Sequence, residues 1–322
     1  METEKTTKMT SQKNEHLDIP GNPSTAKTST IGLNDRSNGK PLGLLSEDDW
    51  SFWLENGYVV IKNAVPKSQA KRMADVLWEY EGKDPKDQES WYKMPNPTMK
   101  MEELTNTGMV EIYNHQFMWD NRQYPKVHQA FCDIWGTEKL WVTIDRANLN
   151  FPVRKGFEYK GFIHWDYDPE SKPQNVQGVL ALADQMDENM GGFQCIPELY
   201  REYDSWKLTQ PIDRDHFRPD ITGFDVVKVK LEAGDLLIFN STLPHGIRAN
   251  HSKDKVRIAQ YISMMPAQED NEELKQWRIN SWKNKISPEG YAFPGDPLER
   301  EKKQAVAKLT TLGEKLLGLK KW

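Results

Sequence analysis

The second half of the chain carries a succession of short β-rich runs, and this pattern limits the folds that are open to it. Glycines such as Gly191, Gly192 and Gly234 mark turns between the runs. Short strands at regular spacing predict an antiparallel sandwich or barrel. The predicted strands are Trp141–Leu149, Phe162–Tyr167, Val176–Ala183, Phe193–Ile196, Phe224–Leu231, Leu236–Phe239 and Val256–Met264.

Helical patterns flank these runs on both sides. Ser46 and Asp49 have the spacing of a capping box, and Gly57 ends the helix that they predict. Pro66 opens a second helix, and residues 125–136 form a third. Leucines spaced three and four apart near the end of the chain predict a C-terminal helix over residues 297–320. Helices followed by short strands indicate an α+β protein with a mainly β core.

Composition divides the chain into two parts. Residues 1–40 contain no aromatic residue and are rich in Ser, Thr, Asn and Lys. Such a segment buries too little apolar surface to offset its ordering entropy, so we predict a disordered N-terminal tail. Residues 41–322 are predicted to form a single domain. Within it, residues 82–107 are polar and interrupted by prolines, which indicates either a lid or a surface excursion.

The charge balance excludes several classes of partner. The chain has 43 basic and 48 acidic side chains, a net charge of −5, so we expect no nucleic acid partner. It has no run of about 18 apolar residues, so we expect no membrane span. The first thirty residues lack the apolar stretch of a secretory signal. Cys132 and Cys195 are too few for a disulfide framework, and a reducing cytoplasm is the expected location.

One His-x-Asp pair lies inside a predicted strand. Residues two apart in a strand point to the same side, so His164 and Asp166 can reach one ion together. His245 follows Pro244 near the end of another predicted strand and is the best third ligand. Two imidazoles and one carboxylate form the facial triad that binds Fe(II) with open positions. A zinc hydrolase with the same three ligands is an alternative, although no glutamate beside the motif offers a general base.

A single arginine on a later predicted strand strengthens the iron interpretation. Arg257, Ala259 and Tyr261 share one face of that strand. An inward-pointing guanidinium needs an anion to compensate its buried charge. The distal carboxylate of 2-oxoglutarate would bind it in a bidentate manner. The alternative is a salt bridge to one of the many acidic residues.

Taken together, these segments resemble the phytanoyl-CoA dioxygenase family of Fe(II)/2-oxoglutarate oxygenases over about residues 44–322. The family carries Pro-Gly-Ser-His in many members where this chain has Pro197 to Tyr200. The resemblance implies a double-stranded β-helix (cupin-type jelly roll) with flanking helices. The matching stretches are Leu44–Val65, Gly161–Asp166, Val176–Leu180, Gly191–Pro197, Gly234–Phe239, Pro244–Gly246, Arg257–Ile262 and Leu309–Gly318.

The resemblance also implies a chemistry. His164, Asp166 and His245 become the iron ligands, and Arg257 anchors 2-oxoglutarate. The cosubstrate is then decarboxylated to succinate and CO2 as O2 is consumed, and a C–H bond of a small-molecule substrate is oxidised. Related halogenases replace the carboxylate ligand, so Asp166 leaves hydroxylation, desaturation or oxidative cyclisation. Relatives act on acyl-CoA thioesters, amino acids and natural products, which includes secondary metabolism.

Further polar residues are candidates for the same site. Asn148 and Gln177 are expected to contact the cosubstrate, and Arg146 the substrate, with a structural hydrogen bond as the alternative for each. Arg154 and Arg248 lie in sequence near the motif residues. If they gather at the mouth of the site, the substrate carries a carboxylate or phosphate; otherwise they are solvated charges.

Tyr113 and Gln116 follow the proline-rich excursion and are predicted to line a lid over the substrate. Because the surface is not basic, we expect a small acid-bearing metabolite rather than a CoA ester. Two other functions stay open: a non-catalytic cupin-type ligand-binding protein, or a hydroxylase of an acyl-CoA thioester. We expect a monomer or a homodimer.

Overall fold

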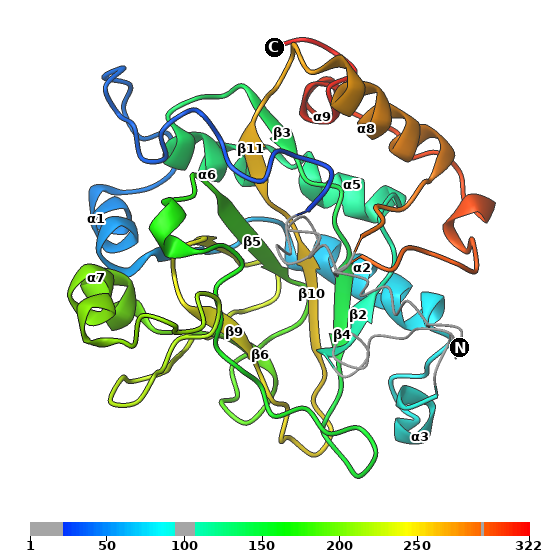
Figure 1. The fold of residues 1–322 in the computed structure, drawn as a ribbon. Coiled ribbons are helices and arrows are strands. Elements are labelled where there is room, and N and C mark those ends of the chain that lie inside the picture. The colour runs from blue at the N-terminus through cyan, green and yellow to red at the C-terminus, as the bar shows by residue number, and fades with distance from the viewer. Residues whose placement is uncertain (1–21, 94–106, 291–292) are drawn as a thin grey trace, which may run out of the picture.

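A computed structural model describes residues 22–93, 107–290 and 293–322, and antiparallel sheets form its centre (Figure 1). The larger sheet has the strand order β1-β8-β5-β10-β4-β2, and every neighbouring pair is antiparallel. Its strands are β1 (Tyr58–Ile61), β2 (Met109–Val110), β4 (Ala147–Asn150), β5 (Val176–Ala181), β8 (Leu236–Asn240) and β10 (Arg257–Tyr261).

A smaller sheet faces the larger one. Its order is β7-β6-β9, with β6 spanning Gly192–Cys195, β7 Val227–Lys228 and β9 His245–Arg248. Apolar side chains from both sheets form a shared cluster that includes Phe193 and Phe239. A further pair, β3 (Leu140–Val142) with β11 (Met264–Pro266), extends the assembly. The combination of helices with mainly antiparallel sheets agrees with the predicted α+β class.

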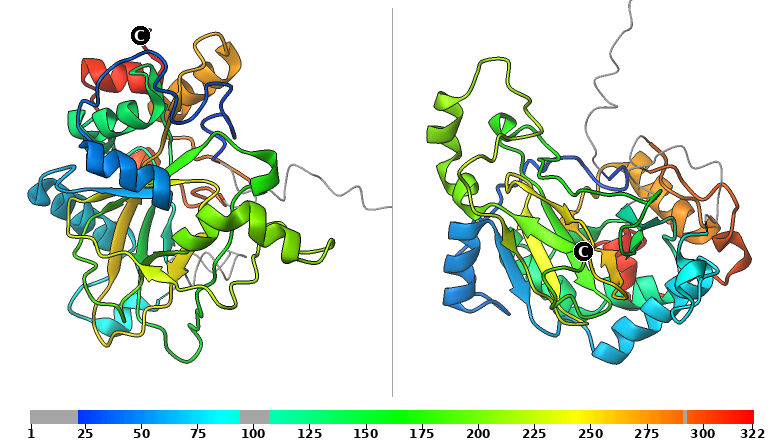
Figure 2. Two further views of the ribbon diagram at one scale, coloured as in Figure 1. Left: turned by 90° about the vertical axis from the view of Figure 1, so that its left-hand side faces the viewer. Right: turned by 90° about the horizontal axis from the view of Figure 1, so that it is seen from below.

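Helices cover the outer face of the larger sheet and its ends. Figure 2 shows α1 and α7 together on one side of the molecule and α8 with α9 on another. The α-helices are α1 (Glu47–Asn56), α2 (Lys67–Tyr80), α3 (Gln88–Trp91), α5 (Gln116–Arg122), α6 (Pro125–Trp135), α7 (Pro197–Trp206), α8 (Glu272–Asn284) and α9 (Thr311–Leu317). Three short 3-10 helices are η1 (Pro169–Ser171), η2 (Lys207–Thr209) and η3 (Glu301–Lys303).

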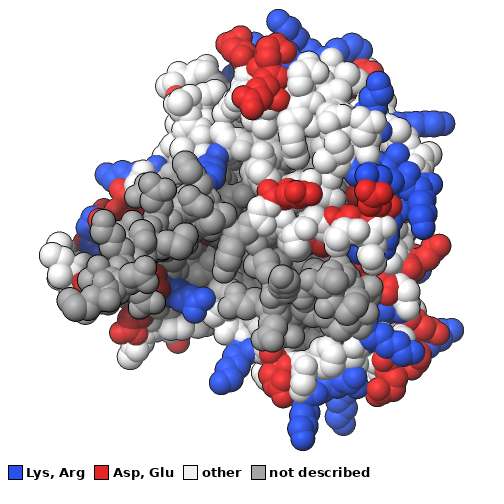
Figure 3. All heavy atoms as spheres, turned by 45° about the vertical axis from the view of Figure 1, so that its right-hand side comes forward, with Lys and Arg blue, Asp and Glu red and all other residues white. Residues whose placement is uncertain are grey.

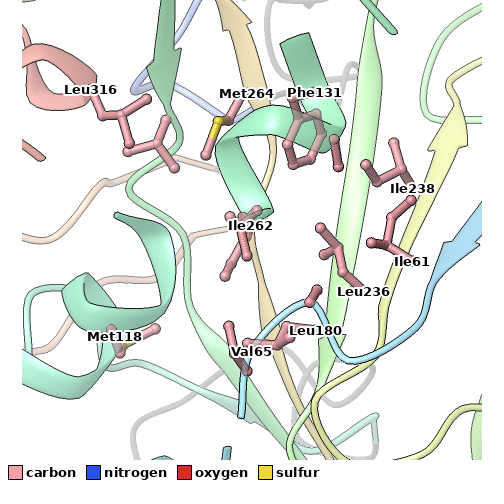
Figure 4. Close-up of a cluster of buried hydrophobic side chains, with 14 of the residues drawn as sticks. Ile61, Val65, Met118, Phe131, Leu180, Leu236, Ile238, Ile262, Met264 and Leu316 are labelled. Atoms are coloured by element: carbon pink, nitrogen blue, oxygen red, sulfur yellow. The ribbon is translucent and has the colours of Figure 1, made fainter. Parts of the chain in front are cut away.

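The main hydrophobic core lies between the helices and the larger sheet. Figure 4 shows Phe131 of α6, Leu180 of β5 and Ile238 of β8 gathered in this layer. All three are completely buried. Burying side chains of this size stabilises the fold by about 1.5–3 kcal/mol each. The helices therefore pack on the outer face of the larger sheet, and the smaller sheet packs on its inner face.

The local helix signals are confirmed. The Ser46 side chain accepts a hydrogen bond from the Asp49 N–H, and the Ser46 N–H donates one to the Asp49 carboxylate, so the capping box is complete. Gly57 ends α1 with φ 71°, a left-handed conformation that favours glycine. Gly136 ends α6 in the same way, at φ 65°.

Two of the predicted strands are wrong in detail. Residues 162–167 form no strand, and only His164 makes an isolated β-bridge, with His245. The predicted strand Trp141–Leu149 is divided into β3 and β4 by residues 143–146. The remaining runs appear as β5, β6, β7, β8 and the pair β10 and β11, although Phe224–Leu231 contributes only Val227–Lys228 and Val256–Met264 is divided between two strands. Strand β9 was not predicted.

The prediction of a disordered tail is wrong for residues 22–40. Ser24 is completely buried, and its hydroxyl accepts a hydrogen bond from the Ile144 N–H at 2.8 Å. Its carbonyl accepts another from Arg278 of α8 at 2.5 Å. This part of the chain is held by polar contacts to the backbone rather than by aromatic packing, which composition does not reveal. Residues 1–21 lie outside the described range.

The predicted C-terminal helix over residues 297–320 is also wrong, because only α9 and η3 are helical there. Between them the Lys308 N–H donates to the Gln116 side chain, and the Thr310 N–H donates to the Gln123 side chain. Side chains of α5 and its C-terminal cap thus take backbone donors that a continuous helix would use. Thr310 then caps α9 by accepting from the Gly313 N–H.

The surface is mixed in charge. On the face shown in Figure 3, Lys and Arg side chains are interspersed with Asp and Glu over the coloured residues. In the part of the chain that the structure describes, no helix is long and apolar enough to cross a bilayer.

Candidate active site

Three of the predicted residues converge. One ligand atom each from His164, Asp166 and His245 lies within 4.8 Å of the other two. Nε2 of His164 is 3.2 Å from Oδ1 of Asp166, and Nε2 of His245 is 3.5 Å from its Oδ2. The two imidazoles therefore face the same carboxylate from either side, which is the arrangement that one ion would need.

Backbone pairing brings the two histidines together. The His164 N–H donates to the His245 carbonyl at 2.9 Å, and the His245 N–H donates back at 3.0 Å. Gly246 permits this close approach, because a Cβ at that position would lie 1.9 Å from the Phe162 carbonyl oxygen. Although residues 162–167 are not a strand, their two-residue spacing still places His164 and Asp166 on the same side.

His245 is held in a defined orientation. Its Nδ1 lies 2.9 Å from the Leu243 carbonyl oxygen, so the proton resides on Nδ1 and the lone pair on Nε2 points at the site. The ring stacks on Phe193 at 5.8 Å between centroids and also packs against Phe239. This packing leaves the imidazole little freedom to rotate away from the carboxylate.

Asp166 is oriented by Gln177, which projects from β5. The Gln177 side-chain amide donates to Oδ2 of Asp166 at 2.5 Å. Burial opposes ionisation of Asp166, but the adjacent imidazoles of His164 and His245 outweigh it and hold its pKa well below the ordinary value. The carboxylate is therefore ionised and fixed. Gln177 was expected to touch the cosubstrate, and its actual contact is with the aspartate.

Arg257 enters the same cavity from β10. It is only 1% exposed, and its Nη1 donates to Oδ1 of Asn148 at 2.6 Å and to the Tyr261 hydroxyl at 3.3 Å. Its Nε has no hydrogen-bond partner, and no carboxylate forms an ion pair with it within the described ranges. The salt-bridge alternative for this arginine is therefore not observed there. A buried guanidinium with neutral partners is suited to an anionic ligand.

A cavity of about 190 Å³ connects these groups. The three candidate ligands and Arg257 line it together, and Phe193 and Phe239 supply part of its apolar wall. The donor set of two imidazoles and one carboxylate, with the cavity on its open side, matches the facial triad of Fe(II) sites. Arg257 on the same cavity matches a dicarboxylate cosubstrate.

Arg146 also lines the cavity but is paired. Its guanidinium lies 3.2 Å from Glu111 and over the ring of Phe293 at 4.1 Å. Burial opposes its charge, yet Tyr113 and Glu111 raise its pKa overall. Tyr113 is completely buried and donates its hydroxyl to Glu111. Tyr113 is thus part of a structural network behind the cavity instead of a lid over it.

Three further predicted site residues lie away from the cavity. Arg154 pairs with Glu89 and stacks on Tyr92 at 3.5 Å from the ring centroid. Arg248 is buried and donates to the carbonyl oxygens of Met190 and Phe193, and burial lowers its pKa to about 10. Gln116 hydrogen-bonds the Lys308 backbone. None of the three lines the cavity, so the predicted cationic mouth and the Gln116 lid are wrong.

Several lining residues were not predicted. Asn22 and Thr25 come from the N-terminal segment, Asp145 follows β3, and Asn175 precedes β5. The signal that could have indicated Asp145 is its place beside Arg146 in an otherwise apolar run. Composition gives no signal for Asn22 and Thr25, which lie in a polar segment without motifs.

Comparisons with known proteins agree with this geometry. The chain is 28% identical over 244 residues to the Ava biosynthesis cluster protein O of Aspergillus versicolor, covering 68% of this chain and 77% of that protein. It is 23% identical over 283 residues to a Dictyostelium discoideum protein that is named as a phytanoyl-CoA dioxygenase, covering 74% of this chain and 80% of that protein.

Among solved structures, the GlcNAc inducible gene 2 protein of Candida albicans has a similar fold. The TM-score is 0.61 at 13% identity, over 86% of this chain and 77% of that protein. The family model described as phytanoyl-CoA dioxygenase (PhyH) matches residues 53–259, which is more than half of the chain and includes all three candidate ligands and Arg257. The chain therefore belongs to the phytanoyl-CoA dioxygenase family of non-haem iron, 2-oxoglutarate-dependent oxygenases.

Proposed function

We propose that this protein oxidises an unactivated C–H bond of a small molecule, with Fe(II) held by His164, Asp166 and His245. The observation that carries the proposal is Arg257, a buried cation with neutral partners that shares the cavity with these three side chains. A dicarboxylate that reaches the metal at one end and the guanidinium at the other would satisfy both. 2-Oxoglutarate has that chemistry.

Each neighbouring residue then has a definite task. Leu243 keeps the His245 lone pair on Nε2 through the carbonyl contact at Nδ1. Gln177 holds the Asp166 carboxylate through Oδ2, which leaves its other oxygen toward His164. Asn148 holds the Arg257 guanidinium in place, because its amide also donates to the Thr107 carbonyl and is therefore fixed. Such supporting contacts tune affinity as strongly as some ligands do.

When bound, iron and 2-oxoglutarate supply the oxidation of a C–H bond with release of succinate and CO2. The protein positions the substrate and limits the access of water. Phe193 and Phe239 pack against His245 and present apolar surface to the cavity, and Val179 of β5 lies beside them. An apolar wall of this kind strengthens the interaction between Arg257 and a bound carboxylate. Hydroxylation, desaturation and oxidative cyclisation are all compatible with this arrangement.

We infer that the two facing sheets form a double-stranded β-helix. The larger sheet and the β7-β6-β9 sheet are both antiparallel and enclose a shared apolar cluster, which supports this assignment. His245 opens β9 in the smaller sheet, whereas Arg257 opens β10 in the larger one. The candidate site thus lies between the two sheets, where a cupin-type fold would hold a ligand.

A role in secondary metabolism is supported by the similarity to a protein named for a biosynthesis cluster in Aspergillus versicolor. The expectation of an acid-bearing substrate depended on Arg154 and Arg248, and neither lines the cavity. We therefore propose a small metabolite without assuming an acidic group. An acyl-CoA substrate is the alternative, and it is supported only by the names of the family and of the Dictyostelium discoideum relative.

The proposal is tested by substrate-independent turnover. Full-length protein with Fe(II), 2-oxoglutarate and O2 should form succinate and consume O2 in a one-to-one ratio. His245→Ala should reduce succinate formation to the rate without enzyme. Addition of candidate natural products should raise the rate for the true substrate class. Succinate formation that is unaffected by His245→Ala would contradict the proposal.

A further inference from the structure

The charged side chains that line the cavity do not balance once those that pair with another side chain are left out. Arg146 is paired with Glu111 at 3.2 Å. Arg257 is assigned to the cosubstrate in the proposed function. Asp145 also lines the cavity, and within the described residues its carboxylate forms no ion pair. Its carboxylate accepts hydrogen bonds from the backbone N–H of Arg146, at 2.7 Å, and from the Asn22 side chain. The charge that faces a substrate is therefore negative.

The polar groups near Asp145 are mostly acceptors as well. Asn175 uses its amide nitrogen to donate to the Lys27 carbonyl at 2.5 Å and to the Tyr167 hydroxyl at 2.8 Å. Its amide oxygen accepts no hydrogen bond from the described residues, and the residue lines the cavity. Thr25 adds a hydroxyl group, which can accept or donate. We call Thr25, Asp145 and Asn175 the acceptor wall.

The N-terminal segment holds this wall together. Asn22 lies against Asp145, and its side chain donates to the Ile144 carbonyl at 3.3 Å. The Lys27 carbonyl receives the Asn175 amide from the other side. Ser24, between them, is fixed by Ile144 and Arg278. Figure 1 shows this segment in dark blue, running across the end of the strands near β11. The wall is thus a built surface with anchored parts.

The cavity also has an apolar lining. Phe193, Phe239, Val179, Met265 and Phe293 contribute to it. A ligand that fits both this lining and the acceptor wall has an apolar body and a polar group that donates hydrogen bonds. A carboxylate at the wall would meet Asp145 as a like charge, which costs binding free energy.

We propose that the acceptor wall recognises the substrate through a hydrogen-bond donor, either a protonated amine or a hydroxyl group, and rejects substrates that carry a carboxylate there. This inference rests on the proposed function, because it assigns the substrate class of the same cavity. Asp145 is the specificity-determining residue, and Asn175 supports it with its amide oxygen. Burial raises the pKa of Asp145, although the charges of Arg146 and Arg122 and the hydrogen bonds from the Arg146 N–H and the Asn22 side chain favour the ionised form.

The test uses three probes with one carbon skeleton: 4-tert-butylcyclohexylamine, 4-tert-butylcyclohexanol and 4-tert-butylcyclohexanecarboxylate. Each is titrated into full-length protein loaded with Fe(II) and 2-oxoglutarate without O2. Broadening of the probe's proton NMR lines by the paramagnetic iron reports binding beside the metal. We expect the amine and the alcohol to bind and the carboxylate to bind at least about tenfold more weakly.

Asp145→Asn keeps an oxygen for the Arg146 N–H and removes the charge. It should weaken the amine about tenfold or more, the alcohol less, and should reduce the penalty on the carboxylate. Asp75→Asn is the matched control, since Asp75 is exposed and pairs only with Lys71; it should change none of the three affinities. If the variant does not fold, the preference of the unmodified protein among the three probes still decides.

The inference is overturned if the carboxylate binds as well as the amine, if neither the amine nor the alcohol is broadened, or if Asp145→Asn leaves all three affinities unchanged. Failure of the proposed function has a different signature. In that case, the protein without O2 shows no visible charge-transfer absorption on addition of Fe(II) and 2-oxoglutarate, before any probe is added.

Discussion

Arg257 and Asn148 are joined by a 2.6 Å hydrogen bond from the guanidinium Nη1 to the amide Oδ1. A buried arginine is usually paired with a carboxylate, and here its partner is a neutral amide that is itself fixed by the Thr107 carbonyl. Among the described residues no acidic side chain pairs with it, so within that part of the chain the positive charge at the cavity is uncompensated. Such a charge lowers the stability of the ligand-free protein and raises the affinity for an anion.

The first prediction follows from that charge. Arg257→Met should leave the stability of the ligand-free protein unchanged or raise it by about 1 kcal/mol, because it removes a buried charge without an anionic partner. In thermal unfolding, 2-oxoglutarate should stabilise the unmodified protein, and the same change should abolish this stabilisation. The exposed Arg72→Met is the control and should preserve that stabilisation. A loss of several kcal/mol in ligand-free Arg257→Met would contradict this account.

A second prediction concerns Gln177, which touches a proposed ligand without being one. Gln177→Ala should weaken Fe(II) binding about ten- to hundredfold, because Asp166 loses the donor that orients it. His164→Ala removes a ligand atom and should weaken binding more. Competition with a coloured Fe(II) chelator measures both affinities. Gln210→Ala, at a half-buried position outside the cavity, should have no effect. Equal affinities for Gln177→Ala and the unmodified protein would refute the role of Gln177.

The N-terminal segment supplies a third prediction. Ser24→Ala should lower the free energy of unfolding by about 1–3 kcal/mol, because the buried Ile144 N–H loses its acceptor. Ser37 is exposed, and Ser37→Ala should change stability by less than about 0.5 kcal/mol. Urea unfolding of both variants measures the difference. If Ser24→Ala has the same free energy of unfolding as the unmodified protein, the segment does not pack on the domain in solution.

Glu301 leads to a fourth prediction, on pH. Burial raises its pKa to about 7 from the ordinary 4.5, although the N–H groups of Tyr113 and Asn114 and the charge of Arg122 favour the ionised form. Between these values the folded protein keeps a proton that the unfolded chain has released. Stability contributed by the protonated carboxyl is therefore complete below about pH 4.5 and is lost as the pH rises through 7.

The size of this pH effect is about 3 kcal/mol, since each pKa unit corresponds to about 1.4 kcal/mol. Glu301→Gln cannot titrate, so the difference in unfolding free energy between it and the unmodified protein should change by that order between pH 4.5 and 7.5. Urea unfolding at several pH values measures it. A difference that is independent of pH would show that Glu301 is ionised throughout.

The convergence of the candidate metal ligands could be predicted because their geometry depends on local spacing. His164 and Asp166 share a side through their two-residue separation even without a regular strand. The convergence of His245 on them was inferred from its position after a predicted strand and the turn-forming Pro244, and the reciprocal backbone bridge with His164 is its physical basis. Short-range regularities of this kind survive errors in the assignment of strands.

The arginines show where sequence reasoning stops. Arg248 and Arg257 are both inward-facing and follow similar patterns, yet the carbonyl oxygens of Met190 and Phe193 saturate Arg248. Those partners lie more than 50 residues away along the chain, so the sequence does not indicate which arginine is left for a ligand. The tail was misjudged for a related reason, since Ser24 is held by two distant backbone groups.

The most direct measurement is a titration of 2-oxoglutarate into the Fe(II)-loaded protein without O2, followed by visible absorption. Bidentate binding of the keto acid to iron beside Arg257 should produce a weak charge-transfer band that saturates with 2-oxoglutarate. The band should be absent in His164→Ala and should require much more 2-oxoglutarate in Arg257→Met. A protein that binds zinc at the site, or binds iron without giving this band, would contradict the account.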